Sequence, residues 1–255
     1  MMMTIRFLLM SMLISGSLHA METTIVIRAK ARDAKFIGSS IGGAWVIVRN
    51  AASAEILAQG KTQGSTGNTQ LIMNTSWERG GRLTDDETAK FEATLDIDDP
   101  TFVTIEVISP INNRQAQVHA STQLWIIPGK HILGDGITVE IPGFVVDILE
   151  PRTHQYISLN SIENQKLQVK ANMVMMCGCT ISKGGIWDSE KMDVAAIIKM
   201  NGKQILEIPL GLISENLFSA EFLVDSPGMY EITVYAFDGA TGNTGVDKVS
   251  YVVRD

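Results

Sequence analysis

The sequence predicts an all-β protein that consists of two tandem β-sandwiches after a signal peptide. From Thr23 onward, apolar residues recur with a period of two, as in half-buried strands, and rarely with the period of 3.6 that marks a helix. Gly, Pro, Asn and Asp divide this pattern into short runs. The chain of 255 residues is 45% hydrophobic and 19% charged, so it can bury one large core or two ordinary ones.

The first twenty residues have the three parts of a secretory signal peptide. Residues 1–6 carry one positive charge, residues 7–15 are mostly apolar, and residues 16–20 are mostly small. An apolar run of this length is too short to cross a bilayer core, which needs about twenty residues. We therefore expect cleavage after Ala20, a mature chain without a membrane span, and a secreted protein of the bacterial periplasm.

Strand-like runs occupy the mature chain on both sides of the Pro142-Gly143 pair. Before this pair, the expected strands are residues 24–29, 44–49, 55–58, 90–96, 102–108, 123–127 and 137–141. After it, they are residues 144–149, 167–176, 194–200, 204–208, 218–224, 229–237 and 246–253. Because the pattern restarts after Pro142, we expect one sandwich over residues 21–142 and a second over residues 143–255.

An internal repeat supports this division. Residues 91–100 match residues 218–227 at an offset of 127, and both segments run from a Phe through a strand to an Asp and then a Pro. An alternating strand follows each of them. A turn at Pro100 and at Pro227 would reverse the chain, so the sequence predicts the same hairpin in each half.

Segments in both halves resemble known families. Residues 235–253, with an Ala-x-Asp-x-x-x-Gly-Asn pattern, resemble the last hairpin of bacterial immunoglobulin-like domains, and this likeness covers residues 143–255. Residues 43–50 and 56–62 are similar to the carboxypeptidase-regulatory-like and transthyretin-like β-sandwiches. The Met-Cys-Gly-Cys segment resembles a family of secreted bacterial proteins to which no activity is attached. Immunoglobulin-like and transthyretin-like domains are usually spacers, adhesive modules or binding platforms, so the resemblance implies a non-catalytic interaction role.

Charge and motifs limit the function further. The chain has 28 acidic and 21 basic residues and a formal net charge of −7, so it lacks the positive field that neutralises phosphates, and nucleic acid is not an expected partner. Residues 38–42 match the Gly-x-Ser-x-Gly pattern of hydrolases, but a strand and not a helix is expected after them. We therefore expect no enzyme, and a protein or a glycan as the partner.

Residues 173–179, Met-Val-Met-Met-Cys-Gly-Cys, hold the most reactive side chains. Strand alternation would place Met175, Cys177 and Cys179 on one inward face, in a row of sulfur atoms. Thiolate and thioether sulfurs select Cu(I), so one alternative is a periplasmic Cu(I) site. Its ligands would be Cys177 and Cys179, with Met175 or Met176 as the third. No other cofactor is expected.

Two other interpretations of this segment stay open. Methionine and cysteine are good core fillers, so the row is equally compatible with plain packing. In an oxidising compartment, Cys177 and Cys179 can also form a reducible disulfide and act in thiol–disulfide exchange.

The loop that follows, residues 182–188, adds Trp187 and Asp188 as candidate contacts with a partner. Glycines in this loop permit a tight path of the chain, and a large indole at its end is suited to burial against another molecule. The alternative is that Trp187 is the core tryptophan common in immunoglobulin-like sandwiches.

Overall fold

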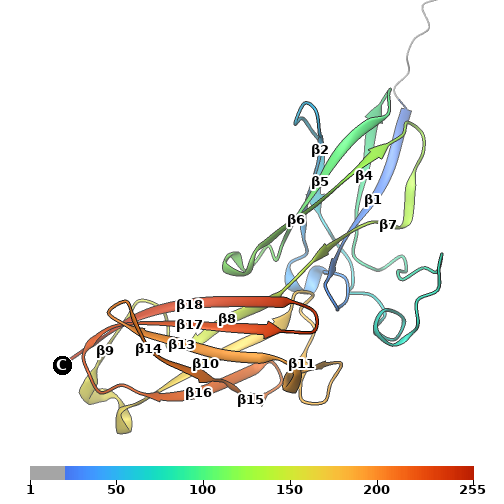
Figure 1. Ribbon diagram of the computed structural model, residues 1–255. Coiled ribbons are helices and arrows are strands. Elements are labelled where there is room, and N and C mark those ends of the chain that lie inside the picture. Colours follow the sequence, from blue (N-terminus) through green and yellow to red (C-terminus); the bar gives the residue numbers. More distant parts are fainter. Residues whose placement is uncertain (1–20) are drawn as a thin grey trace, which may run out of the picture.

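The computed structural model describes residues 21–255, so the expected signal peptide lies outside the described residues. The strands form two β-sandwiches, one from β1 to β7 and one from β8 to β18 (Figure 1). Within residues 21–255, no strand of the first set pairs with a strand of the second. The prediction of an all-β fold built from sandwiches is confirmed. In the same part of the chain, no helix has the length and apolar character needed to span a membrane.

The first sandwich packs a three-stranded sheet, in the order β4-β1-β7, against a four-stranded sheet, in the order β3-β2-β5-β6. Among the strand pairs of this sandwich in residues 21–255, β1 and β7 alone run parallel. The strands are β1 (Met21–Ala31), β2 (Trp45–Asn50), β3 (Ile56–Lys61), β4 (Phe91–Ile97), β5 (Thr101–Ser109), β6 (Val118–Ile126) and β7 (Ile132–Ile141). Short helical turns join them: η1 (Ser39–Ile41), η2 (Gln70–Asn74) and η3 (Arg114–Ala116).

The second sandwich packs a four-stranded sheet, β15-β16-β10-β8, against a five-stranded sheet, β14-β13-β17-β18-β9. A two-stranded ladder of β11 and β12 stands beside them. The strands are β8 (Phe144–Glu150), β9 (Gln155–Ser158), β10 (Lys166–Met175), β11 (Ile181–Ser182), β12 (Trp187–Asp188), β13 (Asp193–Met200), β14 (Lys203–Pro209), β15 (Gly211–Ser214), β16 (Leu217–Leu223), β17 (Gly228–Asp238) and β18 (Asn243–Arg254). The helical turns are η4 (Leu159–Ser161), η5 (Glu163–Gln165) and η6 (Ser189–Lys191).

The cores follow the predicted period of two. Along most of β10, every second residue is buried between the sheets, and the residues between them lie nearer to solvent. The same holds for β5 and β17. Full burial of one Val, Leu or Ile side chain stabilises a fold by roughly 1.5–3 kcal/mol. Burial therefore fixes the register of each strand, because a slip of one residue would bring its apolar side chains to the surface.

The prediction of a shared hairpin is wrong, although the repeat itself is real in three dimensions. In the first half, β4 pairs with β1 while β5 pairs with β2 and β6, so the chain crosses from one sheet to the other. In the second half, β16 pairs with β10 and β15 while β17 pairs with β13 and β18. No residue from 98 to 100 or from 225 to 227 has a positive φ, so these turns lack the left-handed conformation that joins paired strands in tight hairpins.

The last hairpin, predicted from its resemblance to immunoglobulin-like domains, is confirmed. Strand β17 pairs with β18 along its whole length, from Gly228 opposite Val253 to Asp238 opposite Asn243. The turn between them includes Gly242, whose φ of +72° is the left-handed conformation that glycine adopts most readily.

Candidate functional sites

The sulfur-rich segment turns back on itself after Met175, the last residue of β10. The Gly178 N–H donates to the Met175 carbonyl (2.7 Å), and the Met175 N–H donates to the Cys179 carbonyl (3.2 Å). Gly178 has a φ of +77°, which ends the extended conformation. The predicted row of sulfur atoms along one strand face is therefore wrong in geometry. All four predicted ligand residues are nevertheless buried: Met175, Met176, Cys177 and Cys179.

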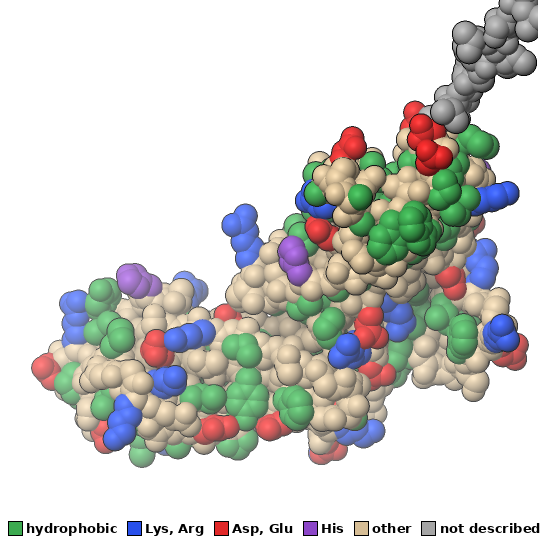
Figure 2. Space-filling model, turned by 45° about the horizontal axis from the view of Figure 1, so that its top comes forward, with side chains coloured by type: hydrophobic (Ala, Val, Ile, Leu, Met, Phe, Trp, Pro, Cys, Tyr) green, Lys and Arg blue, Asp and Glu red, His purple; other side chains and the backbone are tan. Residues whose placement is uncertain are grey.

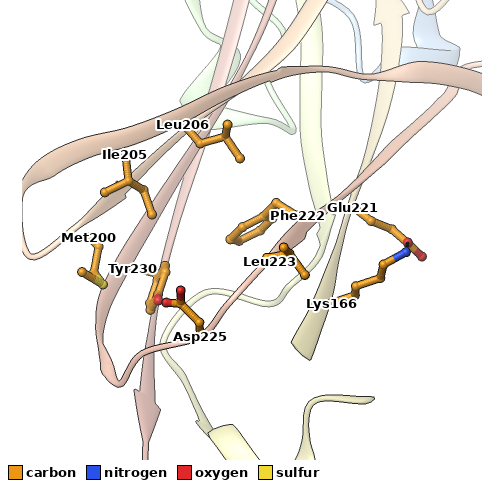
Figure 3. A pocket seen from close by; sticks show the side chains of 9 residues that line it. All are labelled: Lys166, Met200, Ile205, Leu206, Glu221, Phe222, Leu223, Asp225 and Tyr230. Atoms are coloured by element: carbon orange, nitrogen blue, oxygen red, sulfur yellow. Dashed lines mark hydrogen bonds and ion pairs between the residues drawn. The ribbon is translucent and has the colours of Figure 1, made fainter. Parts of the chain in front are cut away.

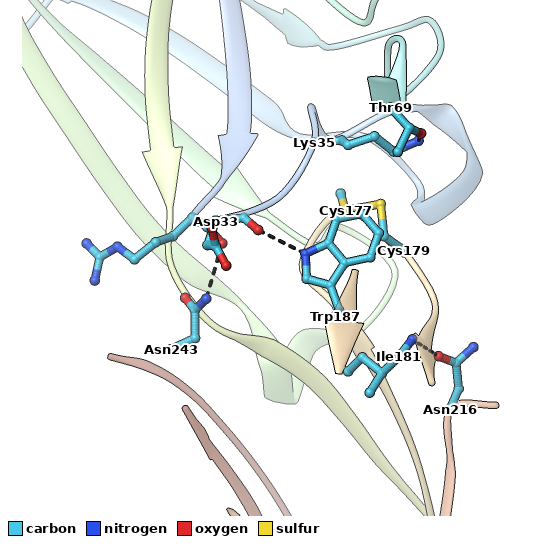
Figure 4. Close-up of a disulfide and its surroundings, with 10 residues drawn as sticks. Asp33, Lys35, Thr69, Cys177, Cys179, Ile181, Trp187, Asn216 and Asn243 are labelled. Carbon is cyan, nitrogen blue, oxygen red and sulfur yellow. Dashed lines mark hydrogen bonds between the residues drawn. A yellow bond between two sulfur atoms is a disulfide. The ribbon is translucent and has the colours of Figure 1, made fainter. Parts of the chain in front are cut away.

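Cys177 and Cys179 form a disulfide, with their Cα atoms 5.4 Å apart (Figure 4). The residues are only 1% and 9% exposed. Bonded to each other, the two sulfurs are not the thiolates that Cu(I) requires, so the donor set does not fit Cu(I) in this oxidised state. Among residues 21–255, no group of three or more His, Cys, Asp or Glu side chains is placed to hold a metal ion.

The disulfide lies at the junction between the two sandwiches. A Cβ atom on Gly178 would lie 3.4 Å from the Ile41 side chain, which belongs to η1 of the first sandwich. Trp187 is 8% exposed, and its indole N–H donates to the Asp33 carbonyl across the junction (2.9 Å, Figure 4). Buried side chains of both sandwiches form one continuous apolar cluster that includes both cysteines and Trp187.

Asn243 makes a second connection across this junction, a role that no local pattern in the sequence predicts. Its side chain is fully buried at the start of β18. The Nδ2 group donates to the Arg32 carbonyl of the first sandwich (3.1 Å), and Oδ1 accepts from the Gly143 N–H (2.7 Å). A buried amide that is paired on both sides specifies one arrangement of its neighbours. The joint is therefore built from directional hydrogen bonds as well as apolar packing.

Asp188 organises the loop in which it lies. Its carboxylate accepts from the N–H groups of Gly184 (2.9 Å) and Glu190 (3.1 Å). These hydrogen bonds, first that from Gly184, hold the pKa of the Asp188 carboxyl below its ordinary value. The predicted role of Trp187 and Asp188 as contacts with an outside partner stays a prediction. In the structure, the Trp187 indole is buried and turned toward the first sandwich.

The second sandwich carries an open apolar groove between its two sheets. The groove has a volume of about 630 Å³ and lies at the start of β17, whereas the junction lies at the end of that strand. Figure 3 shows side chains of the two sheets facing each other across it. The lining residues are Lys166, Met200, Ile205, Leu206, Glu221, Phe222, Leu223, Asp225 and Tyr230.

Apolar side chains form both the floor and the walls of the groove. Phe222 and Tyr230 are buried and make the floor. Ile205, Leu206 and Leu223 are 46%, 37% and 65% exposed, although each is aliphatic. Side chains of this kind exposed together, next to a hollow, are typical of surfaces that another molecule covers.

The polar groups of the groove lie at its rim or are already hydrogen-bonded. Lys166 forms an ion pair with Glu221 (3.3 Å). The Tyr230 hydroxyl donates to the Ser226 carbonyl (2.9 Å), and burial raises the pKa of this hydroxyl. Among residues 21–255, Asp225 has no ion-pair partner. The rim therefore carries one uncompensated negative charge.

The groove exists because the chain changes sheets at Leu210. Within residues 21–255, β14 is an edge strand that pairs with β13 alone. After Leu210 the chain continues as β15, which pairs with β16 only at Leu217–Ser219. The remaining part of β16, residues 220–223, has β10 on one side, and no strand of the described chain lies on the other. The groove opens beside this unpaired edge.

Comparison with known proteins gives structural matches of low TM-score. No protein-family model and no curated protein matches the chain. Similar solved structures include fibronectin(III)-like modules of Clostridium thermocellum CbhA, at 12% identity and a TM-score of 0.25, covering 92% of this chain and 94% of that one. The D1–D4 ectodomain fragment of ICAM-5 has 8% identity and a TM-score of 0.28, covering 92% and 50%. An engineered protein has 15% identity and a TM-score of 0.33, and the match covers 48% of this chain but only 22% of that protein.

Proposed function

We propose that this protein is a secreted, periplasmic, non-catalytic binding module, and that the groove between β14 and β16 is its binding site. The observation that carries the proposal is the exposure of Ile205, Leu206 and Leu223 around a hollow with a buried aromatic floor. A ligand that covers these side chains would gain about 25 cal/mol of binding free energy for each Å² of apolar surface removed from water.

The polar groups of the groove favour a binding role over a catalytic one. Lys166 and Glu221 neutralise each other at the rim. The Tyr230 hydroxyl already donates its hydrogen to the Ser226 carbonyl, so it is not free to donate a proton to a substrate. The junction supports a binding role too. Asn243 and Trp187 join the two sandwiches by hydrogen bonds, so the sandwich that carries the groove is held in a fixed position relative to the other.

A titration of residues 21–255 with Nile red, a neutral apolar dye, tests the proposal. The unchanged chain is expected to bind the dye at one site, with a rise in its fluorescence. Leu223→Glu and Ile205→Glu each place a carboxylate in the groove and are expected to weaken binding at least tenfold.

Ile213→Glu is the matched control, because Ile213 is 57% exposed in the same sandwich but does not line the groove. It is expected to leave dye binding unchanged. Equal binding by the parent, both groove variants and the control would overturn the proposal.

The disulfide favours thiol–disulfide exchange as a second candidate function. In this reaction an external thiolate attacks the sulfur of Cys177 or Cys179, forms a mixed disulfide with it, and releases the other cysteine as a thiolate. A second thiolate of the same dithiol partner then attacks the partner's sulfur in the mixed disulfide. This step forms a disulfide in the partner and releases the attacked cysteine, so that Cys177 and Cys179 are both left reduced. Against this role stands the burial of both cysteines, which restricts access of an attacking thiolate.

A single comparison separates this candidate and the Cu(I) alternative from the binding module. Residues 21–255 and the Cys177→Ser, Cys179→Ser double variant are reduced, then titrated with Cu(I) under anaerobic conditions and separately offered a mixed-disulfide substrate. Copper uptake by the parent alone would support the Cu(I) site, and turnover by the parent alone would support exchange. The proposed binding module predicts that parent and variant behave alike in both assays.

A further inference from the structure

We propose that the groove receives an extended peptide segment of a partner protein, which pairs as an added strand with the free edge of β16. This inference rests on the proposed function, because it names the occupant of the same groove. It is argued from the sheet topology, the direction of the side chains and the charge at the rim.

The topology leaves a strand position empty beside β16. Strand β15 occupies that side only opposite Leu217–Ser219, because the chain leaves the sheet at Leu210. Among the strands that the structure describes, residues 220–223 therefore have a partner on one side alone. Four residues of strand extend over about 13 Å, long enough for a short run of backbone hydrogen bonds. Unpaired backbone N–H and C=O groups at a sheet edge are a template for an extended chain.

The side chains around this empty position suit an alternating peptide. Successive side chains of an added strand would point alternately into the sandwich and out of it. The inward ones would meet Phe222 and Tyr230 on the floor and Leu206 on the facing wall (Figure 3). These contacts are apolar, so the peptide is expected to have aliphatic or aromatic residues at every second position.

The rim adds a preference for positive charge. Asp225 lies at the mouth without an ion-pair partner in the described chain, while Lys166 and Glu221 compensate each other. A lysine or arginine beside the apolar positions of the peptide would complement Asp225. The chain itself has a net charge of −7, which disfavours a second copy as the occupant. Figure 2 shows that acidic and basic side chains are scattered among apolar ones over the visible face of the molecule.

The other free edge near the groove is less suited to pairing. Strand β14 has a register shift opposite Ile198 and Lys199, and it ends at Pro209, which has no N–H to donate. Bulges and prolines are devices that protect sheet edges from added strands. Strand β16 has neither device in residues 220–223.

The test uses a set of fluorescein-labelled peptides of nine residues. Each alternates threonine with one apolar residue, valine, isoleucine, leucine or phenylalanine, between terminal lysines. Fluorescence anisotropy with residues 21–255 measures binding, and amide hydrogen exchange measures the protection of residues 220–223. At least one peptide is expected to bind and to slow exchange at those amides of residues 220–223 that point away from β10. The same peptide is expected to lose at least tenfold in affinity in the Leu223→Glu variant.

Two control peptides separate strand pairing from simple insertion of side chains. Methylation of alternate backbone nitrogens removes N–H donors and is expected to weaken binding at least tenfold. Replacement of the terminal lysines by glutamate is expected to weaken it by a smaller factor. Equal binding of the methylated peptide would overturn strand addition while leaving the proposed binding site intact.

Two further outcomes would also overturn the inference. Binding of Nile red without binding of any peptide in the set would retain the groove as a site for apolar molecules but remove the peptide as its occupant. Concentration-dependent dimerisation that protects residues 220–223 would show that a second copy of this chain fills the groove.

Discussion

Replacing Asn243 with alanine removes the amide that connects the two sandwiches and leaves two groups without partners. The side chain is fully buried, and it holds the Gly143 N–H at 2.7 Å and the Arg32 carbonyl at 3.1 Å. A buried donor or acceptor that loses its partner destabilises a protein by about 1–3 kcal/mol. Water that reaches the Arg32 carbonyl in the variant would replace part of its lost hydrogen bond and lower the free-energy cost at this group. We therefore expect a loss of about 2–4 kcal/mol in the free energy of unfolding.

Urea unfolding of residues 21–255, followed by circular dichroism and tryptophan fluorescence, measures this loss. Asn172→Ala is the matched control, because Asn172 is half-buried on β10 and its side chain makes no hydrogen bond within the described chain. We expect the control to change stability by less than about 0.5 kcal/mol. A loss of less than about 0.5 kcal/mol for Asn243→Ala would refute the account of the junction.

Two further substitutions test local features of the fold. Partial burial, and then the neighbouring Asp247, raise the pKa of the Asp147 carboxyl. The folded state therefore holds this proton at a higher pH than the unfolded state, and stability falls as the pH rises from about 4, the ordinary pKa, through the raised value. Asp147→Asn should flatten that decline and raise stability at pH 7 by less than about 1 kcal/mol; urea midpoints from pH 3.5 to 7 that fall as steeply as those of the parent would contradict this. Gly178→Ala forces a side chain onto a φ of +77° and should lower stability by about 1–2 kcal/mol, whereas an unchanged thermal midpoint would show that the turn after Met175 is not fixed as described.

The sequence predicted the strands well because their alternation follows directly from burial. Every strand expected from the period of two is present, with ends that differ by a few residues. The missed strands are β9, β11, β12 and β15, which have two to four residues each. Segments this short contain too few alternations for a period to be recognised.

The sequence could not predict the groove, because its walls come from strands that only the topology brings together. Leu206 and Leu223 lie on opposite sheets, and they flank a position left empty where the chain changes sheets. A local sign was present nevertheless. Ile205-Leu206 and Phe222-Leu223 are adjacent apolar pairs that break the alternation of their strands, so one member of each pair had to lie outside the core.

The predicted row of sulfur atoms in residues 173–179 is wrong for a different reason. Alternation was extended through Gly178, whose left-handed conformation ends the strand, so the two cysteines meet each other instead of forming a row. The burial of the segment was foreseeable from its composition, because methionine and cysteine are common in cores. Its contact with the first sandwich depends on how the two halves meet, which no local pattern encodes.

The most direct test of the central claim is to map where an apolar ligand binds. Methyl NMR spectra of residues 21–255, labelled at isoleucine, leucine and methionine, are recorded during a titration with Nile red. The account predicts shifts confined to the groove, at Met200, Ile205, Leu206 and Leu223, with the Ile41 and Ile181 methyls near the disulfide unmoved. Shifts at Ile41 and Ile181 without any at Leu223 would place binding at the junction and contradict the account.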